Sequence, residues 1–268
     1  MKHTGQGKEK PFYNRSLERA LQILNAFSND KPMLALAQLS DAVSLPRATV
    51  LRLAATLLEF GFLRQDPVTK QYSLGFRLLE LGNSVSSSFS LTRIVGPYMD
   101  LLQSKIGKTI FLGVLDNDDI LYIGKRDDLC NPIAFTSSVG TRRPPAWGMM
   151  GSVLMAYAPE SEKKRLLQKS PLVAFTKNAI TREDEFLEWL HKVREQGYVV
   201  DREMGIEGIT GVAAPIFDHT GKAIAGLGVG FISSSVSNEE LNKIIEEVVR
   251  TALTVSKELG YREKVSTQ

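Results

Sequence analysis

The chain has 268 residues, of which 43% are hydrophobic, and its formal net charge is +3. This length leaves room for two domains with separate cores. No stretch approaches the ~20 consecutive apolar residues of a membrane-spanning helix, so we expect no membrane partner. A single cysteine, Cys130, excludes an intrachain disulfide and favours a cytoplasmic location. Residues 1–14 are polar, lack the apolar core of a signal peptide, and predict a disordered tail.

Three short helices are predicted after this tail, because apolar residues recur there at spacings of three and four. The apolar residues are Leu17, Ala20, Leu21, Leu24 and Phe27 in the first helix, Leu36, Leu39 and Val43 in the second, and Val50, Leu53, Ala54 and Leu57 in the third. Between the last two helices lies Ser44-Leu45-Pro46, and proline fits the start of a helix. Gly61 suits a left-handed cap at the end of the third helix.

A hairpin is predicted directly after the third helix. Its strands are expected at 62–64 and 71–74, with turn-forming residues at 66–69 between them. Three helices followed by a hairpin are the order of a winged helix-turn-helix, which we assign to residues 15–75.

The third helix is predicted to carry a basic face opposite its buried side. Residues one helical turn apart share a surface, and arginine can bind guanine or phosphate in a major groove. Thr49 could cap the helix or bind a phosphate, and the hairpin could meet the DNA backbone or minor groove. The predicted DNA-binding residues are Arg47, Ala48, Thr49, Leu51, Arg52, Arg64 and Lys70.

The charge distribution agrees with double-stranded DNA as the partner of the N-terminal part. Residues 1–83 hold eleven Lys and Arg against seven Asp and Glu, whereas the remainder holds 22 against 23. A basic N-terminal part and a near-neutral remainder are consistent with polyanion binding by the former alone. A small protein-contact module with a solvated basic face is the alternative interpretation.

A linker helix is predicted over 76–90, with a looser serine-rich end from Asn83 to Ser90. Residues 91–262 then alternate between helical and strand patterns, and the strands include pairs separated by turns. Thr181-x-x-Asp184 and Ser237-x-x-Glu240 are expected to open two of the helices. Antiparallel hairpins covered by helices predict an α+β domain.

The candidate motifs for catalysis, metal binding or cofactor binding are incomplete in this sequence. Gly107-Lys108-Thr109 lacks the first glycine of a phosphate-binding loop, and the glycines at 226, 228 and 230 lack the spacing of a dinucleotide site. The three histidines are scattered, and no serine or cysteine stands in a nucleophile motif. We therefore expect no enzymatic activity, no metal and no cofactor.

Five segments resemble the IclR family of transcription regulators in order and spacing, and the resemblance extends over about residues 15–260. These segments are SLERALQILNAF, LSDAVSLPRATVLRLAATLLEFGFL, YSLGFRLLELG, VREQGYVVDRE and GVAAPIFDHTGKAIAGLGV. The resemblance implies a winged helix-turn-helix, a linker helix and an effector-binding domain with a curved antiparallel sheet. It also implies homodimers, often paired as dimers of dimers, that bind palindromic operators and respond to a small organic effector.

The resemblance also locates the effector site. It implies Met149, Met150, Asp201, Gly211, Gly228 and Gly230 as effector-binding residues. Asp201 matches an acidic position of the family. Many relatives have cysteine at the position of Gly211 and polar residues at those of Gly228 and Gly230, so a small keto acid is put in doubt as the ligand.

The physical reading of these departures gives two alternatives. Side chains alternate along a strand, so Gly226, Gly228 and Gly230 fall on one face and leave a hollow. Met149, Met150 and Trp147 would supply adaptable apolar walls for a bulkier or more aromatic ligand, oriented by Asp201. The alternative is that the methionines fill the hollow as core.

The sequence thus predicts a DNA-binding regulator, with a repressor of catabolic genes as the expected form. An activator, a ligand-independent DNA-binding protein, and an enzyme regulated by its N-terminal module are the rival interpretations.

Overall fold

A computed structural model describes residues 14–28, 30–88, 90–128 and 137–262. The predicted tail up to residue 13, and Cys130, lie outside the described residues. The chain divides into two compact units, Met1–Phe89 and Ser90–Gln268, and each is described by itself.

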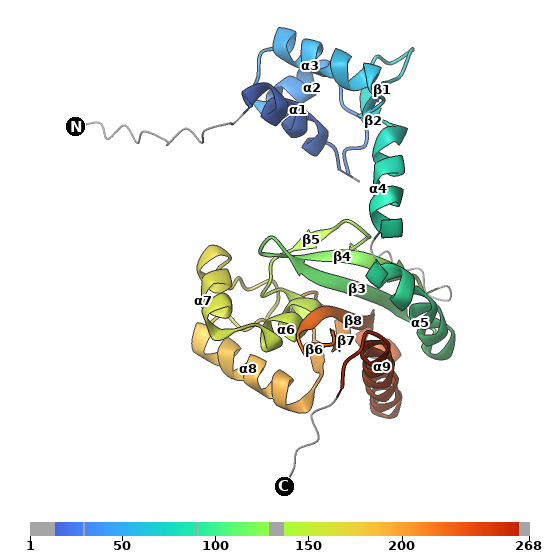
Figure 1. Cartoon of the computed structure of the whole chain (residues 1–268). Coiled ribbons are helices and arrows are strands. Elements are labelled where there is room, and N and C mark those ends of the chain that lie inside the picture. Colours follow the sequence, from blue (N-terminus) through green and yellow to red (C-terminus); the bar gives the residue numbers. More distant parts are fainter. Residues whose placement is uncertain (1–13, 29, 89, 129–136, 263–268) are drawn as a thin grey trace, which may run out of the picture. The chain divides into compact units, whose positions relative to one another are not determined.

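The first unit has the predicted order of three helices and a hairpin, followed by the linker helix (Figure 1). Its elements are α1 Arg15–Asn25, α2 Leu36–Val43, α3 Arg47–Glu59, β1 Leu63–Gln65, β2 Tyr72–Leu74 and α4 Phe76–Ser88. Asn14 does not belong to the predicted disordered tail, because it caps α1 by accepting hydrogen bonds from the backbone of Ser16 and Leu17. The serine-rich residues 83–88, predicted to be loose, are helical and form the last part of α4.

The core of the first unit lies between α1, α2, α3 and the hairpin. Val50 and Ala54 are buried as predicted. In α1 two residues of the predicted apolar stripe, Leu17 and Leu21, lie outside the core, with exposed fractions of 59% and 51%. Ile23 is fully buried instead, because the face that meets the core is centred on it rather than on the first turn of the helix.

The first turn of α4 is joined closely to the end of α3. The backbone N–H of Gly75 donates to the carbonyl oxygen of Phe62 at 2.8 Å, and that of Arg77 donates to Gly61 at 3.3 Å. A Cβ atom on Gly75 would lie only 2.0 Å from the Gly61 oxygen. Gly61 has a φ of +72°, the left-handed conformation predicted for it. Two glycines therefore let the chain turn from α3 through the hairpin and into the linker helix.

The second unit contains a mixture of strands and helices, as expected from the sequence. Its elements are α5 Ser90–Ile106, β3 Thr109–Asp116, β4 Asp119–Arg126, β5 Arg142–Arg143, α6 Gly148–Tyr157, α7 Glu160–Lys169, α8 Glu183–Gln196, β6 Val199–Arg202, β7 Ile209–Phe217, β8 Ala223–Ile232, the 3₁₀ turn Ser233–Ser235 and α9 Asn238–Glu258. The capping box of Ser237 and Glu240 is present. The predicted cap at Thr181 is wrong: α8 is preceded by Arg182, which makes no side-chain cap. The short strand β5 was not predicted.

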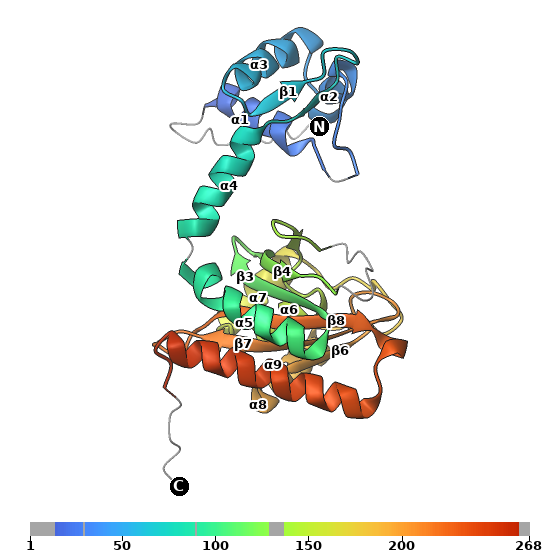
Figure 2. The same ribbon diagram turned by 90° about the vertical axis from the view of Figure 1, so that its right-hand side faces the viewer.

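The antiparallel sheet of this unit separates two layers of helices (Figures 1 and 2). Within the described residues its strands pair in the order β5-β4-β3-β8-β7-β6. Val212 and Ala214 pack with α5 and α9 on one face, whereas Ala213 packs with α6 and α8 on the other. This alternation is the period of two that the strand sequences carry. Helix α6 lies between the sheet and α8, so Met149–Ala156 are all buried.

Candidate nucleic-acid interface and ligand cavity

One face of α3 is exposed and basic. Arg47, Ala48, Leu51 and Arg52 lie on this face, opposite the buried Val50. Among the described residues, no carboxylate forms an ion pair with either arginine. Both guanidinium groups are therefore available to an external anion, and the neighbouring small and apolar side chains leave room for a base edge.

The turn before α3 is built by local backbone chemistry. Ser44 adopts a left-handed conformation at φ +53°, and the Ser40 hydroxyl donates to the Leu45 carbonyl oxygen. Pro46 occupies the position that precedes the helix and offers no side-chain cap. Thr49 does not cap α3; its backbone N–H donates to Pro46. Thr49 as a whole is half-buried.

The two basic residues of the hairpin differ in their surroundings. The Arg64 guanidinium lies 4.6 Å from the centroid of the Phe76 ring in α4, so this side chain connects the hairpin to the linker helix. Lys70 is exposed and has a φ of +58°. Asp66 holds the turn by accepting from the backbone of Val68 and Thr69, and these hydrogen bonds lower the pKa of its carboxyl group.

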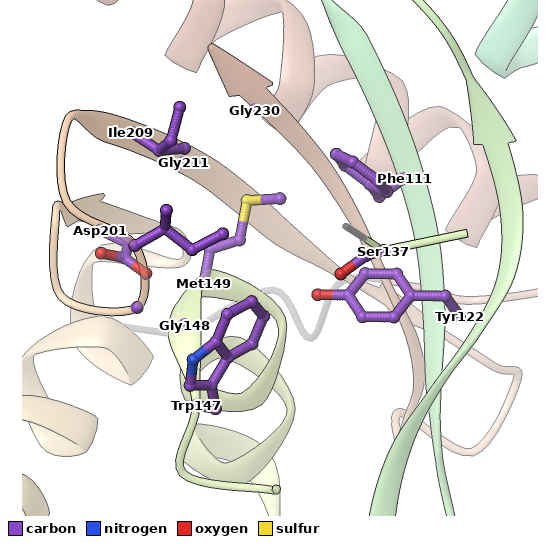
Figure 3. Close-up of a pocket in the computed structure, with 12 residues that line it drawn as sticks. Phe111, Tyr122, Ser137, Trp147, Gly148, Met149, Asp201, Ile209, Gly211 and Gly230 are labelled. Atoms are coloured by element: carbon purple, nitrogen blue, oxygen red, sulfur yellow. The ribbon is translucent and has the colours of Figure 1, made fainter. Parts of the chain in front are cut away.

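A cavity of about 50 Å³ lies at the N-terminal end of α6 (Figure 3). Five of the seven predicted effector-binding residues line it: Trp147, Met149, Asp201, Gly211 and Gly230. The other described residues that line it are Phe111, Tyr122, Ser137, Gly148, Gly205, Ile206 and Ile209. Met150 and Gly228, also predicted, are not among the lining residues. The cavity thus combines aromatic rings from β3 and β4 with the start of α6 and the loop between β6 and β7.

Asp201 is the one charged residue among the described residues of this wall, and it is only 6% exposed. Its carboxylate accepts from the backbone N–H of Met204 at 2.7 Å and from those of Gly205 and Met149. Burial nevertheless raises the pKa of Asp201 to about 6, because the charged form is poorly solvated there and the three hydrogen bonds only partly compensate. Gly148 stands beside it with φ +66°, where a Cβ atom would lie 3.5 Å from the carboxylate.

The aromatic side of the cavity is held by ring contacts. Phe111 and Tyr122 meet edge to face with centroids 5.5 Å apart. Burial raises the pKa of Tyr122 to about 12, although a hydrogen bond with Ser137 opposes the shift. The Arg143 guanidinium lies 4.7 Å from the centroid of the Trp147 ring. These contacts fix the rings around the cavity.

The predicted glycine hollow exists, but methionine side chains occupy it. A Cβ atom on Gly211 would lie 2.6 Å from Met149 Sδ, and one on Gly228 would lie 3.1 Å from the same sulfur. A Cβ atom on Gly226 would lie 2.5 Å from Met150 Sδ. Met150 is fully buried, so for this residue the core alternative describes the structure. Met149 both fills the hollow and borders the cavity (Figure 3).

Phe111, Tyr122 and Ser137 were missed by the sequence reasoning. Phe111 and Tyr122 stand in predicted strands and had no distinguishing local motif. Their pairing on one sheet face, opposite the start of α6, follows from strand order, which a single sequence does not reveal. Within the described residues there is neither a group of His, Cys, Asp and Glu that could bind a metal nor a helix able to cross a membrane.

Comparisons with known proteins agree with this architecture over both units. Residues 16–67 match the IclR helix-turn-helix domain, and residues 83–257 match the C-terminal domain of bacterial transcriptional regulator IclR. The regulator XynR of Escherichia coli K12 is 32% identical over 247 residues, which cover 92% of this chain and 98% of XynR. The regulator KdgR of the same organism is 32% identical over 248 residues, covering 92% and 94% respectively.

A solved structure has the same fold. The IclR-type transcriptional regulator of Alicyclobacillus acidocaldarius superposes with a TM-score of 0.83 at 27% identity, covering 93% of this chain and all of that one. Both units therefore have their counterparts among regulators rather than enzymes. The chain belongs to the IclR family of bacterial transcriptional regulators, with a helix-turn-helix DNA-binding domain and a C-terminal effector-binding domain.

Proposed function

We propose that this regulator binds a palindromic operator as a homodimer and releases it when a small organic effector enters the cavity at α6. Residues 15–75 would bind DNA, 76–90 would link the domains and 91–262 would bind the effector in the cytoplasm. The observation that carries the proposal is the exposed face of α3, whose two arginines have no ion-pair partner among the described residues.

The contacts to DNA are proposed from position and chemistry. Arg47 and Arg52 would enter the major groove with α3, together with Ala48 and Leu51. Thr49 and Lys70 would contact phosphates, which fix the register without reading sequence. Arg64 would contribute mainly by positioning the hairpin, since its guanidinium already lies over Phe76.

Exposed apolar side chains support self-association of the first unit. Phe76 and Leu79 are 65% and 61% exposed and stand three residues apart on α4, and Leu17 and Leu21 are exposed on α1. Neighbours three or four residues apart form a stripe on a helix, and apolar stripes of this kind mark protein contacts. Pairing two copies would place two recognition helices against half-sites about one DNA turn apart. Dimers of dimers would extend the same arrangement.

Repression is the expected direction, because a protein bound across a promoter blocks polymerase by occupancy alone. Activation needs an additional surface that contacts polymerase. The effector can weaken operator binding only if its affinity differs between the DNA-bound and free forms of the protein. A reporter gene under the native promoter would decide the direction: deletion of the regulator should raise expression, and a fall would identify an activator.

The direct test is fluorescence anisotropy with the intergenic DNA beside the regulator's own gene and with a scrambled duplex. We expect tight binding to the native duplex alone. Arg47→Ala and Arg52→Ala should each weaken binding to the native duplex by about 1–3 kcal/mol if the arginine contacts a base. If it contacts a phosphate instead, the slope of log affinity against log salt concentration should become shallower by about 0.9. Arg250→Ala in α9 is the charge-matched control. Equal, weak binding to both duplexes would contradict the proposal.

A regulator that binds DNA without responding to any ligand is the second candidate. The cavity is small, and Met149 already occupies part of the hollow beside it. Thermal unfolding with a panel of small alcohols, phenols and organic acids distinguishes the two candidates. A midpoint unchanged by every compound, together with specific operator binding, would favour this second candidate.

A further inference from the structure

We propose that the cavity at the start of α6 selects an uncharged ligand that donates a hydrogen bond to Asp201, namely a small alcohol or phenol rather than a carboxylate. This inference rests on the proposed function, since it specifies the chemical class of the effector. It is carried by the distribution of charge and of hydrogen-bond donors around the cavity.

Among the described residues that line the cavity, the only charge is negative and no cation compensates it. Asp201 is the only charged member of the described residues that line the cavity. An anionic ligand would be buried beside this carboxylate, and like charges in a poorly solvated site repel strongly. The same charge favours a ligand hydroxyl, because a hydrogen bond to an ionised acceptor is stronger than one between neutral groups.

One of the backbone donors at the start of α6 that would attract an anion is already used by the protein. The start of a helix presents free N–H groups that bind carboxylates and phosphates well. At α6 the Met149 N–H is taken by Asp201, whose carboxylate also accepts from Met204 and Gly205 in the loop after β6. A carboxylate has about four acceptor positions on its two oxygens. Three backbone donors therefore leave capacity for a further donor, which a hydroxyl group of the ligand can supply.

Two cations lie against aromatic rings that line the cavity. Arg143 lies over the Trp147 ring, with 4.7 Å from its guanidinium carbon to the ring centroid. Lys125 lies 6.0 Å from the Phe111 ring centroid and pairs with Asp127 at 2.8 Å. Neither cation is among the residues that line the cavity, although Arg143 is close enough to oppose the rise in the pKa of Tyr122, so Asp201 supplies the charge that a bound ligand meets directly.

The other residues that line the cavity indicate the size and polarity of the rest of the ligand. Met149, Ile206, Ile209 and the Phe111 ring are apolar, and the hydroxyl groups of Tyr122 and Ser137 lie across the cavity from Asp201 (Figure 3). The volume of about 50 Å³ has room for a few molecules the size of water, each needing roughly 10–15 Å³ on this scale. A compact body with one or two hydroxyl groups matches this space. A ring requires Met149 to move, which its flexible thioether chain permits.

The test compares ligands that differ only in a carboxylate or a hydroxymethyl group. The full chain is titrated by calorimetry at about pH 7.5, where Asp201 is largely ionised, with propane-1,2-diol against lactate and with benzyl alcohol against benzoate. We expect the alcohol of at least one pair to bind at least tenfold more tightly than its acid. In Asp201→Asn that ratio should fall at least tenfold. Asp218→Asn, which removes another carboxylate that accepts backbone N–H groups but lies in the β7–β8 turn, should leave the ratio unchanged.

The wild-type ratio decides the inference even if the Asp201 variant does not fold. Tighter binding of lactate or benzoate than of the matched alcohol would overturn it, and so would the absence of binding by all four compounds. Operator binding is measured on the same preparation by anisotropy. Specific operator binding with the wrong ligand preference rejects only the ligand class, whereas loss of operator specificity rejects the proposed function whatever the ligand preference.

Discussion

Met149 lies against bare backbone, because its neighbours on the sheet are glycines. The Cβ position of Gly211 is 2.6 Å from Met149 Sδ and 3.2 Å from Met149 Cβ. Any side chain at residue 211 would therefore have to displace the methionine. Since Met149 also lines the cavity, its displacement should change the space that remains for a ligand.

Gly211→Ala should destabilise the effector-binding domain by about 1–3 kcal/mol through overpacking against Met149. Met149→Ala alone should cost about 2–5 kcal/mol by leaving a void. In the double variant the new methyl group occupies part of that void, so its cost should be smaller than the sum by about 1 kcal/mol or more. Denaturant unfolding of the four proteins measures this coupling. If the losses of unfolding free energy in the two single variants simply add up in the double variant, the contact between residue 211 and Met149 is contradicted.

Asp201 should make stability depend on pH in a direction opposite to that of most carboxylates. Its pKa is raised from 3.8 to about 6 by burial, so between these values the folded chain binds more protons than the unfolded chain. Its stabilising contribution is therefore complete below about pH 4 and is lost as the pH rises through 6.

The wild type is compared with Asp201→Asn by denaturant unfolding at several pH values. The unfolding free energy of the wild type relative to the variant should fall by about 3 kcal/mol between about pH 4 and pH 7. Because the variant keeps every other titrating group, the difference isolates this carboxyl group. A difference that is independent of pH, or that grows with pH, would show that Asp201 is not poorly solvated in the folded protein.

At the scale of elements, the junction between α3 and α4 depends on backbone contact. Gly75→Ala would place a Cβ atom 2.0 Å from the Gly61 oxygen, which belongs to the backbone and cannot rotate away. We expect a loss of about 3 kcal/mol in the stability of the DNA-binding domain, with weaker operator binding because the hairpin and α4 shift. Gly82→Ala within α4 meets nothing within 4 Å and should stabilise α4 by up to about 1 kcal/mol. Hydrogen exchange of α3 and α4 measures both effects, and equal protection in the two variants would contradict the prediction.

Elements with strong local signals were predictable from the sequence. Helix α9 carries both a capping box and a regular apolar period, and its start was placed correctly at Ser237. The start of α8 was misplaced, because acidic residues in its first turn stabilise the helix without the predicted Thr181 cap. The two-residue strand β5 has no periodicity of its own and exists through pairing with Ile120 and Leu121 of β4.

The cavity was predictable only in part, for a similar reason. Alternation along β8 places Gly226 and Gly228 on one face, and the structure agrees. What fills the space above them depends on the helix that packs there: Met150 lies against Gly226, and Met149 lies against Gly228. The roles of Phe111 and Tyr122 arise from the pairing of β3 with β4 and from the loop after β6. These are contacts between distant segments, which periodicity does not encode.

For the whole molecule, regulation requires that effector and operator favour different states of the dimer. This coupling is a free energy, so it must act equally in both directions. If an alcohol that binds the cavity weakens operator affinity tenfold, about 1.4 kcal/mol, then operator DNA must weaken the affinity for that alcohol tenfold. Both affinities are measurable, by anisotropy with saturating alcohol and by calorimetry with saturating operator duplex.

For the full chain, we expect the factor by which the alcohol weakens operator affinity to equal the factor by which the operator weakens alcohol affinity. The Arg47→Ala variant should still bind the alcohol, but operator DNA should no longer change its affinity for the alcohol. A scrambled duplex serves as the control and should leave alcohol affinity unchanged. If the alcohol binds and raises the unfolding midpoint but leaves operator affinity unchanged, the cavity is not coupled to the DNA-binding domain. The chain would then act as a regulator whose operator binding is independent of that ligand, since a ligand with equal affinity for both states shifts neither.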